Sequence, residues 1–225
     1  MRTTFGYFVG GGNSNMNDEK FWNETYYKDL SKYKLDYLKD TWMNKYKETI
    51  CKTNNKNALD LGCGLGQDTQ WLMQNGYHVI SCDISSLALS KLEELYPNVT
   101  TMHLDIANGL PFEDNSMGLA NANLSLHYFK MDKTQEIFDD VFRVLEPSGL
   151  FIGRMNSDKN NYVNSCSQEI EKNFYYNTVH KKYSRLFNKE QFDMLTKKWK
   201  VIVLNENETV RVERKKYTWE FILQK

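Results

Sequence analysis

The chain has 225 residues, of which 40% are hydrophobic, 14% aromatic and 26% charged, and its formal net charge is zero. These values are ordinary for a globular protein and exclude a disordered or fibrous chain. The length suits one domain with a sizeable core. Zero net charge makes a nucleic-acid partner unlikely on electrostatic grounds, and no apolar run reaches the roughly 18 residues of a membrane span.

Charge is unevenly distributed along the chain. Residues 51–171 carry 8 basic and 16 acidic side chains, whereas residues 172–225 carry 13 basic and 6 acidic ones. A solvated surface is the ordinary explanation of such a basic segment, and an anionic substrate is the alternative. The four cysteines are scattered without a C-x-x-C pair. This argues against a zinc site or a disulfide scaffold and favours a reducing, cytoplasmic location.

The N-terminal part precedes the regular pattern of the core. Residues 1–15 hold one basic residue and a Gly-Gly-Gly run but no apolar stretch, which indicates a flexible leader rather than a signal peptide. Apolar residues at helical spacing predict a short helix over about 18–30 and an amphipathic helix over about 34–50. We therefore interpret residues 1–50 as a leader followed by a helical cap.

From residue 51 onward, short apolar runs alternate with helical patterns. Strands are expected at 57–61, 78–82, 99–104, 117–124 and 150–154, with helices in the connections between them, and a final helix begins at Asn188. The last two strands, 201–204 and 218–223, should form an antiparallel hairpin at the edge. This pattern predicts an α/β fold: a seven-stranded, mostly parallel sheet with helices on both faces. Residues 157–187 break the alternation and are expected to be a substrate-side insertion with a short helix.

The run Ala58–Gly66 is a strand that enters a glycine loop and opens a helix. Its glycines, Gly62, Gly64 and Gly66, give G-x-G-x-G, whereas the dinucleotide fingerprint is G-x-G-x-x-G. Asp60 is a second difference, because a carboxylate would repel a pyrophosphate. It suits instead a ligand that carries an ammonium or sulfonium group, while the helix N-terminus favours a carboxylate.

Two further acids close the next two strands. Asp83 follows the second strand, where it can accept hydrogen bonds from both hydroxyls of a ribose. Asp105 follows the third strand, where it can accept from an adenine amino group beside the Ile106 backbone. A single Asp after a strand is usually a turn or cap residue. Three in succession beside a glycine loop are a much sharper signal.

Four segments, LDLGCGLGQDT, GYHVISCDIS, HLDIA and RVLEPSGLF, together resemble the successive motifs of class I S-adenosylmethionine-dependent methyltransferases. The loop and second strand are similar to those of bacterial tellurite-resistance-type small-molecule methyltransferases. The resemblance covers about residues 55–156 and implies a Rossmann-like fold with S-adenosyl-L-methionine as cofactor. It departs from the family at Gly118, where Asp is usual, and at Ser148, where Gly is common. The cofactor contacts it implies are Asp60, Gly62, Cys63, Gly64, Gly66, Asp83, Ile84, Asp105 and Ile106.

In this family the reaction occurs beyond the fourth strand. Asn123 and Ser125 are expected to contact the cofactor, and His127 is the candidate general base because imidazole titrates near neutral pH. A structural His bonded to backbone is the alternative. The segment lacks the [DN]-P-P-[YF] signature of enzymes that methylate adenine or glutamine amides. No metal is expected, and the residues expected near the substrate are Tyr27, Tyr128, Arg154 and Asn156.

Aromatic residues outside the core pattern could line the site. Trp22, Tyr26, Tyr27 and Trp42 are candidates for a lid, and Tyr175, Tyr176 and His180 for an opposite wall; all are also explained by ordinary packing.

The function predicted from the sequence is methyl transfer from S-adenosylmethionine to a small molecule. The alternatives are an NAD-dependent oxidoreductase, a protein or RNA methyltransferase, and a catalytically silent cofactor-binding module. Neither the acceptor atom nor the oligomeric state can be derived from the sequence, since function depends on the site rather than the fold.

Overall fold

The structure, a computed structural model, describes residues 18–32, 42–160, 163, 166–211 and 214–225. The predicted leader and residues 34–41 of the predicted cap lie outside these ranges. Among the described residues, no helix is both long and apolar enough to cross a membrane.

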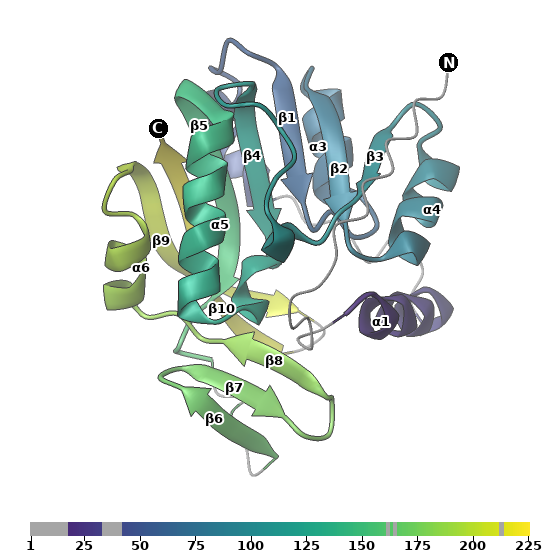
Figure 1. The fold of residues 1–225 in the computed structure, drawn as a ribbon, viewed down its shortest axis with the longest axis vertical. Helices are drawn as coiled ribbons and strands as arrows, with labels where there is room; N and C mark the ends of the chain where they lie inside the picture. Colours follow the sequence, from purple (N-terminus) through teal and green to yellow (C-terminus); the bar gives the residue numbers. More distant parts are fainter. Residues whose placement is uncertain (1–17, 33–41, 161–162, 164–165, 212–213) are drawn as a thin grey trace.

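A seven-stranded sheet forms the centre of the molecule, in the order β3-β2-β1-β4-β5-β10-β9 (Figure 1). All neighbouring pairs are parallel except β5–β10 and β10–β9, which confirms the expected edge hairpin. The hairpin is longer than predicted, because its polar residues 205–211 continue the ladder beyond the apolar core. The strands are β1 (Asn57–Leu61), β2 (His78–Asp83), β3 (Thr100–His103), β4 (Met117–Asn123), β5 (Leu145–Asn156), β9 (Lys200–Arg211) and β10 (Arg214–Gln224).

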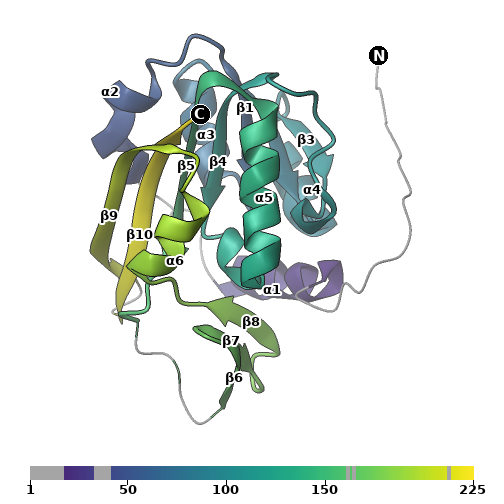
Figure 2. The same ribbon diagram turned by 60° about the vertical axis from the view of Figure 1, so that its left-hand side comes forward.

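Helices cover both faces of this sheet (Figures 1 and 2). On one face, α5 (Met131–Val144) and α6 (Lys189–Leu195) bury an aromatic core that includes Phe138, Phe151 and Phe221. On the other face, α2 (Lys47–Ile50) and α3 (Gln67–Gln74) cover a smaller apolar cluster. The remaining helix of the core, α4 (Ser86–Leu95), packs beside β2 and β3 and is capped by Ser85, as predicted.

The N-terminal cap is confirmed in part. Helix α1 (Glu19–Lys32) matches the predicted first helix. The described part of the predicted second helix begins instead with a 3-10 turn, η2 (Trp42–Tyr46), which α2 then continues. In this turn the Trp42 side chain is buried and donates from its indole nitrogen to Asp68.

The prediction of a short helix within residues 157–187 was wrong. Its described residues form an antiparallel sheet of three strands: β6 (Ser167–Glu171), β7 (Phe174–Asn177) and β8 (Lys182–Arg185). The rings of Phe174 and Tyr183 stack at 5.5 Å between β7 and β8, and such cross-strand aromatic pairs stabilise a sheet. This small sheet lies beyond the carboxyl ends of the central strands (Figure 1).

Both departures from the family pattern have a structural counterpart. A Cβ at Gly118 would lie 2.0 Å from the Asn55 carbonyl oxygen, so a larger residue is excluded there. Ser148 has a φ of 72°, which explains why glycine is common at its position.

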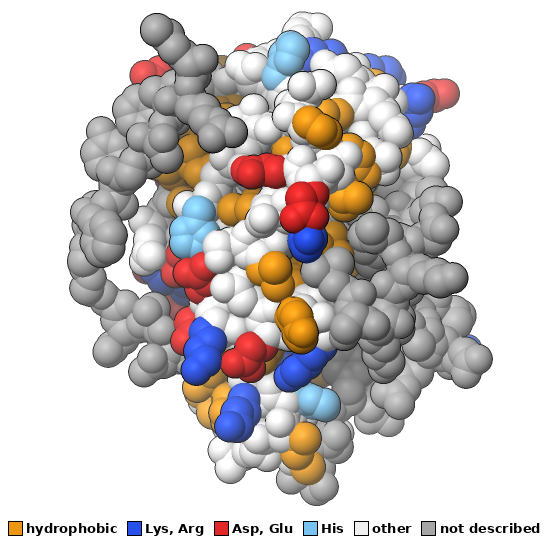
Figure 3. Space-filling view, turned by 90° about the vertical axis from the view of Figure 1, so that its right-hand side faces the viewer, with side chains coloured by type: hydrophobic (Ala, Val, Ile, Leu, Met, Phe, Trp, Pro, Cys, Tyr) orange, Lys and Arg blue, Asp and Glu red, His pale blue; other side chains and the backbone are white. Residues whose placement is uncertain are grey.

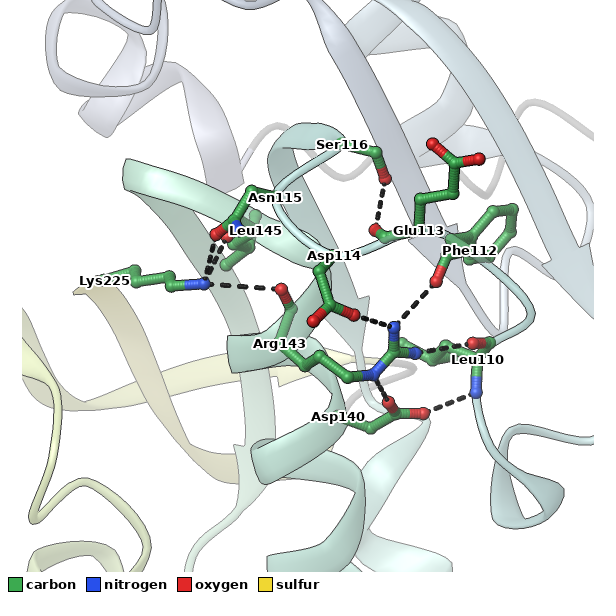
Figure 4. Close-up of polar contacts among 10 residues, drawn as sticks. All are labelled: Leu110, Phe112, Glu113, Asp114, Asn115, Ser116, Asp140, Arg143, Leu145 and Lys225. Carbon is green, nitrogen blue, oxygen red and sulfur yellow. Dashed lines mark hydrogen bonds and ion pairs between the residues drawn. The ribbon is translucent and has the colours of Figure 1, made fainter.

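A polar cluster at the amino ends of the parallel strands joins α5 to the loop before β4 (Figure 4). We call it the Arg143–Lys225 cluster. The guanidinium of Arg143 donates to Asp140, Asp114 and the carbonyl oxygens of Leu110 and Phe112. The ammonium of Lys225 donates to Asn115 and to the carbonyl oxygens of Arg143 and Leu145.

Candidate active site

The glycine loop adopts a left-handed backbone at all three of its glycines. Gly62, Gly64 and Gly66 have φ values of 76°, 54° and 81°, which side-chain-bearing residues rarely adopt. A Cβ would also lie 2.4 Å from Ser125 Cβ at Gly62 and 2.0 Å from Leu92 Cδ1 at Gly66. Glycine is therefore required here for both conformation and space, and the loop opens directly into α3.

Asp83 lies beside this loop, at the end of β2. One of its carboxylate oxygens accepts from the Gly64 backbone nitrogen at 2.9 Å, and the other from that of Ser85 at 2.8 Å. The side chain is buried, and desolvation raises the pKa of Asp83. Each oxygen keeps a second lone pair, so the carboxylate can accept two hydroxyl groups as well.

Asp105 and its neighbours lie at the end of β3. The Asp105 carboxylate accepts from the Ala107 backbone nitrogen at 3.0 Å and from the Asn108 amide at 3.2 Å, and so caps the 3-10 turn η3 (Ile106–Asn108). This is the turn role that the sequence left open as the alternative. Ile106 packs into the core, and the Ile84 carbonyl oxygen is 2.8 Å from His103 Nε2.

A pair of buried carboxylates lies behind the loop, and the sequence identified only one of them. Asp60 and Asp68, which we call the acid pair, both receive hydrogen bonds from the Asn121 amide nitrogen, at 2.8 and 3.0 Å. Thr69 also donates to Asp60, and Trp42 to Asp68. The available signals were Asn121, a polar residue between two alanines of a buried strand, and Asp68 in the first turn of α3.

The negative charge of the acid pair is only partly compensated by neighbouring groups. Burial, reinforced by the neighbouring Asp68 carboxylate, raises the pKa of Asp60 to about 7. Burial also raises the pKa of Asp68, against hydrogen bonds from Asn121 and the charge of Arg154. The side-chain oxygen Oδ1 of Asn121 is buried and has no hydrogen-bond partner. The arrangement therefore holds unsatisfied acceptors and excess negative charge, which an ammonium group would complement.

The residues that end β4 and β5 pack around this pair. Arg154 Nε donates to the side-chain oxygen Oδ1 of Asn123 at 2.8 Å, and its guanidinium lies 5.1 Å from the Trp42 ring. Arg154 therefore lies near the acid pair, and its predicted role at the substrate stays a prediction. Ser125 Oγ donates to the Leu61 carbonyl oxygen at 2.7 Å, which binds the ends of β1 and β4 together.

His127 lies in the 3-10 turn η4 (Leu126–Tyr128) that follows β4. Its side chain is only 3% exposed, and its Nδ1 has no hydrogen-bond partner. Burial, with the charges of Lys216 and Lys182, lowers the pKa of His127 well below its ordinary value. The imidazole is therefore neutral at pH 7 and can accept a hydrogen bond or a proton.

Helix α1 crosses the carboxyl edge of the sheet near the glycine loop (Figure 1). A Cβ at Gly64 would lie 2.8 Å from the Tyr26 hydroxyl, so Tyr26 covers the loop. The ring of Tyr128 packs 4.9 Å from that of Trp22 and 4.2 Å from that of His127. Tyr27, which the sequence analysis expects near the substrate, is 69% exposed on α1.

On the insertion side, Asn156 is the predicted residue that reaches the small sheet. Its amide nitrogen lies 3.5 Å from Ser184 Oγ on β8. Tyr176 packs within the small sheet, 4.8 Å from the ring of Tyr183, while Tyr175 is partly exposed and His180 lies exposed in the turn before β8.

Residues 59–153 match the methyltransferase domain family. An uncharacterized methyltransferase of Synechocystis sp. is 34% identical over 46% of this chain and 49% of its own length. Human mitochondrial arginine-hydroxylase NDUFAF5 is 30% identical over 61% of this chain and 40% of its own. Wheat phosphoethanolamine N-methyltransferase 1 is 31% identical over 42% of this chain and 20% of its own length. The chain thus spans at most about half the length of these curated relatives.

Solved structures share the fold. A protein from Pyrococcus horikoshii superposes with a TM-score of 0.68 at 20% identity, over 89% of this chain and 98% of that one. TehB from Haemophilus influenzae superposes with a TM-score of 0.64 at 16% identity, over 91% of this chain and 67% of that one. The motifs, the domain match over residues 59–153 and this architecture agree: the chain contains a methyltransferase domain with the fold of S-adenosylmethionine-dependent methyltransferases.

Proposed function

We propose that the chain transfers a methyl group from S-adenosylmethionine to a small-molecule acceptor at the carboxyl edge of β1 and β4. The observation that carries this proposal is the acid pair beside the glycine loop. A class I methyltransferase must hold a zwitterionic methionine end and a ribose in this place, and the residues present have the matching charge and hydrogen-bonding capacity.

The cofactor fits the described residues on three grounds. The acid pair and the unpartnered side-chain oxygen Oδ1 of Asn121 offer acceptors to an ammonium group. Asp83 has free lone pairs for the ribose hydroxyls, and the loop glycines leave room for close approach to the backbone. Asp105 and Ile106 are proposed to face the adenine, although Asp105 already caps a turn.

When bound, S-adenosylmethionine supplies a methyl group already activated by its sulfonium. The protein then mainly has to align the acceptor and exclude water. Trp22 and Tyr128 would form an apolar wall next to His127, and Asn156 would orient a polar acceptor from the other side. We propose that α1 and the β6–β8 sheet cover this site from opposite sides.

His127 is proposed to receive the proton that the acceptor loses. Its unpartnered Nδ1 and its neutral state at pH 7 are the properties that a base needs. Because its pKa is lowered, the imidazole stays neutral to below pH 6.5, and the acidic limb of the pH profile would lie there rather than near neutrality.

A small acceptor is favoured because His127 is almost fully buried in η4, which packs against β8 of the small sheet. The relatives point in two directions: one is named for phosphoethanolamine and another for arginine hydroxylation. A protein acceptor is therefore the second candidate. The free cysteines of the chain favour a cytoplasmic location.

The test is isothermal titration calorimetry with S-adenosylhomocysteine and with NAD, followed by methyl-transfer assays on a metabolite panel and on protein substrates. We expect the protein to bind S-adenosylhomocysteine but not NAD, and to methylate a metabolite. NAD binding without S-adenosylhomocysteine binding would contradict the cofactor assignment. Turnover of proteins alone would favour the second candidate, and cofactor binding without any turnover a silent module.

A further inference from the structure

Polar side chains cross the central sheet next to the acid pair. Two neighbouring rows across β5, β10 and β9 consist only of polar residues: Arg154–Glu220–Asn205 and Asn156–Thr218–Asn207. We call these two rows the polar strip. Side chains at alternate positions of a strand face the same side of a sheet. Because Ile222, two residues after Glu220, belongs to the apolar cluster beneath α2 and α3, the polar strip lies on that face of the sheet.

Trp42 joins the polar strip to the acid pair. Its indole nitrogen donates to Asp68, and its ring lies 5.1 Å from the guanidinium of Arg154. Arg154 is also the register partner of Asn123 on β4 and donates to its side-chain oxygen. The polar strip therefore begins at two positions that the sequence analysis assigned to the cofactor and the substrate.

Three side-chain atoms of the polar strip are buried without a hydrogen-bond partner: Glu220 Oε1, Thr218 Oγ1 and Asn207 Nδ2. The Glu220 and Thr218 side chains belong to residues that are 0% and 1% exposed. A buried polar atom without a partner costs free energy, so native interiors hold few of them, and three in neighbouring positions need a common explanation. They offer an acceptor, a hydroxyl and a donor, which a ligand with both donors and acceptors would satisfy together.

The charge of Glu220 is already compensated. Its Oε2 accepts from Lys45 Nζ at 2.7 Å and from the Tyr46 hydroxyl at 2.8 Å, both of which come from η2. Arg154 is its register partner on the other side. A bound cation would add to these positive charges, and a bound carboxylate would face the Glu220 oxygen. An uncharged polar group avoids both costs.

The polar strip reaches the surface at two places. The Lys45 side chain, which contacts Glu220, is 47% exposed, and Asn205 is exposed at the β9 end of its row. Figure 3 shows the side of the molecule on which α1 and α4 lie in Figure 1, where basic and acidic side chains are interspersed. The described surface there has no field of a single sign that would steer a charged ligand.

We propose that the polar strip binds the non-reacting end of the acceptor, and that this end is an uncharged carboxamide-type group. Its N–H donates to Glu220 Oε1, its carbonyl oxygen accepts from Asn207 Nδ2, and the Thr218 hydroxyl bonds to either. The rest of the acceptor extends along the polar strip toward the end of β4. This rests on the proposed function and adds the substrate class to it.

The test follows the Asn207 side-chain amide by nuclear magnetic resonance, on protein loaded with S-adenosylhomocysteine. Three probes of the same shape are titrated separately: acetamide, which is neutral, acetate, which is anionic, and acetamidinium, which is cationic. A saturable shift of the Asn207 signal is expected with acetamide. Its affinity should exceed that of both charged probes by about tenfold or more, because each of them mismatches either the donor or the acceptor of the polar strip.

Two variants that keep the shape of the side chain sharpen the test. T218V removes the unpartnered hydroxyl and should weaken acetamide binding by about threefold or more without lowering the melting temperature. The matched control is T100V, at the exposed start of edge strand β3, and should leave binding unchanged. E220Q keeps an oxygen for Lys45 and Tyr46 and turns its amide nitrogen to the ligand, so the preference should move from acetamide toward acetate. If E220Q does not fold, T218V carries the test.

An Asn207 signal that no probe shifts would mean that the polar strip holds ordered water only, and it would overturn the proposal. Equal affinity for the three probes, or equal effects of T218V and T100V, would do the same. In the metabolite assays, T218V should raise the KM of the acceptor and leave the affinity for S-adenosylhomocysteine unchanged. Calorimetry separates the two claims: an unmodified protein that does not bind S-adenosylhomocysteine contradicts the proposed function, whereas cofactor binding without the acetamide preference contradicts this inference alone.

Discussion

The acid pair and the Arg143–Lys225 cluster lie toward opposite ends of the central strands, and they differ in how their charges are compensated. In the Arg143–Lys225 cluster, two cations meet two carboxylates and several carbonyl oxygens, and the hydrogen bonds that Arg143 donates to Asp114 and Asp140 raise the pKa of its guanidinium (Figure 4). In the acid pair, two carboxylates are fully buried and bridged by one neutral amide. Balanced charge favours the folded state, whereas excess buried charge of one sign favours binding of the opposite charge.

This difference predicts that changes at the reaction side affect function and leave stability intact. The largest effect is expected for His127→Asn, which removes the proposed base but keeps a polar side chain. Turnover should fall by about 10²–10⁴-fold, and the acidic limb below pH 6.5 should disappear from the rate profile. Affinity for S-adenosylhomocysteine and the melting temperature serve as controls. Near-normal turnover at every pH would remove the base assignment.

The converse is expected for Arg143→Ala. This change leaves two acids and two carbonyl oxygens without their donor, so the free energy of unfolding should fall by about 1.5–3 kcal/mol. Urea denaturation measures this loss. Affinity for S-adenosylhomocysteine should be unchanged, and a tenfold weaker affinity would show that the two ends are coupled.

Asp60→Asn tests the acid pair directly. At pH 8 the variant lacks one buried negative charge, so the dissociation constant for S-adenosylhomocysteine should rise about tenfold, which is roughly 1.4 kcal/mol. The unliganded variant should be no less stable than the unmodified protein, because the lost carboxylate was poorly compensated. A large loss of stability with unchanged affinity would assign Asp60 to the scaffold instead.

The smallest effect is expected for Lys225→Ala. Its ammonium donates to carbonyl oxygens at the C-terminal end of α5 and complements the helix dipole there. Thermal or chemical denaturation should show a loss of about 0.5–1 kcal/mol, with Lys200→Ala on the exposed edge strand as the matched control. An equal loss in both variants would contradict a specific capping role.

The parts of the molecule that the sequence predicted are local. Apolar runs identified every strand of the central sheet, and glycine spacing identified the loop, because both patterns depend on adjacent residues. The acid pair was missed in part because Asn121 contacts partners 61 and 53 residues away, and no local pattern reports such a contact. The position of Tyr26 over Gly64 likewise depends on how α1 docks.

The insertion shows a different limit of sequence analysis. Its polar and aromatic residues have no clear helical or strand period, and the small sheet is held by stacking between Phe174 and Tyr183 and by the buried Arg185. Arg185 pairs with Glu171 of β6. Such contacts form only once three strands are assembled, so propensity alone could not have favoured strands over a helix.

The central claim, that the acid pair is built to receive an ammonium group, predicts proton release on binding. Asp60 has a pKa of about 7 in the unliganded protein, above its unfolded value, and a bound ammonium should lower it. Titration with S-adenosylhomocysteine at pH 7 in buffers of different ionisation enthalpy should therefore show release of on the order of half a proton. Affinity should weaken from pH 8 to pH 6, and Asp60→Asn should remove much of both effects. Binding without proton release, or with proton uptake, between pH 6 and 7 would contradict the account.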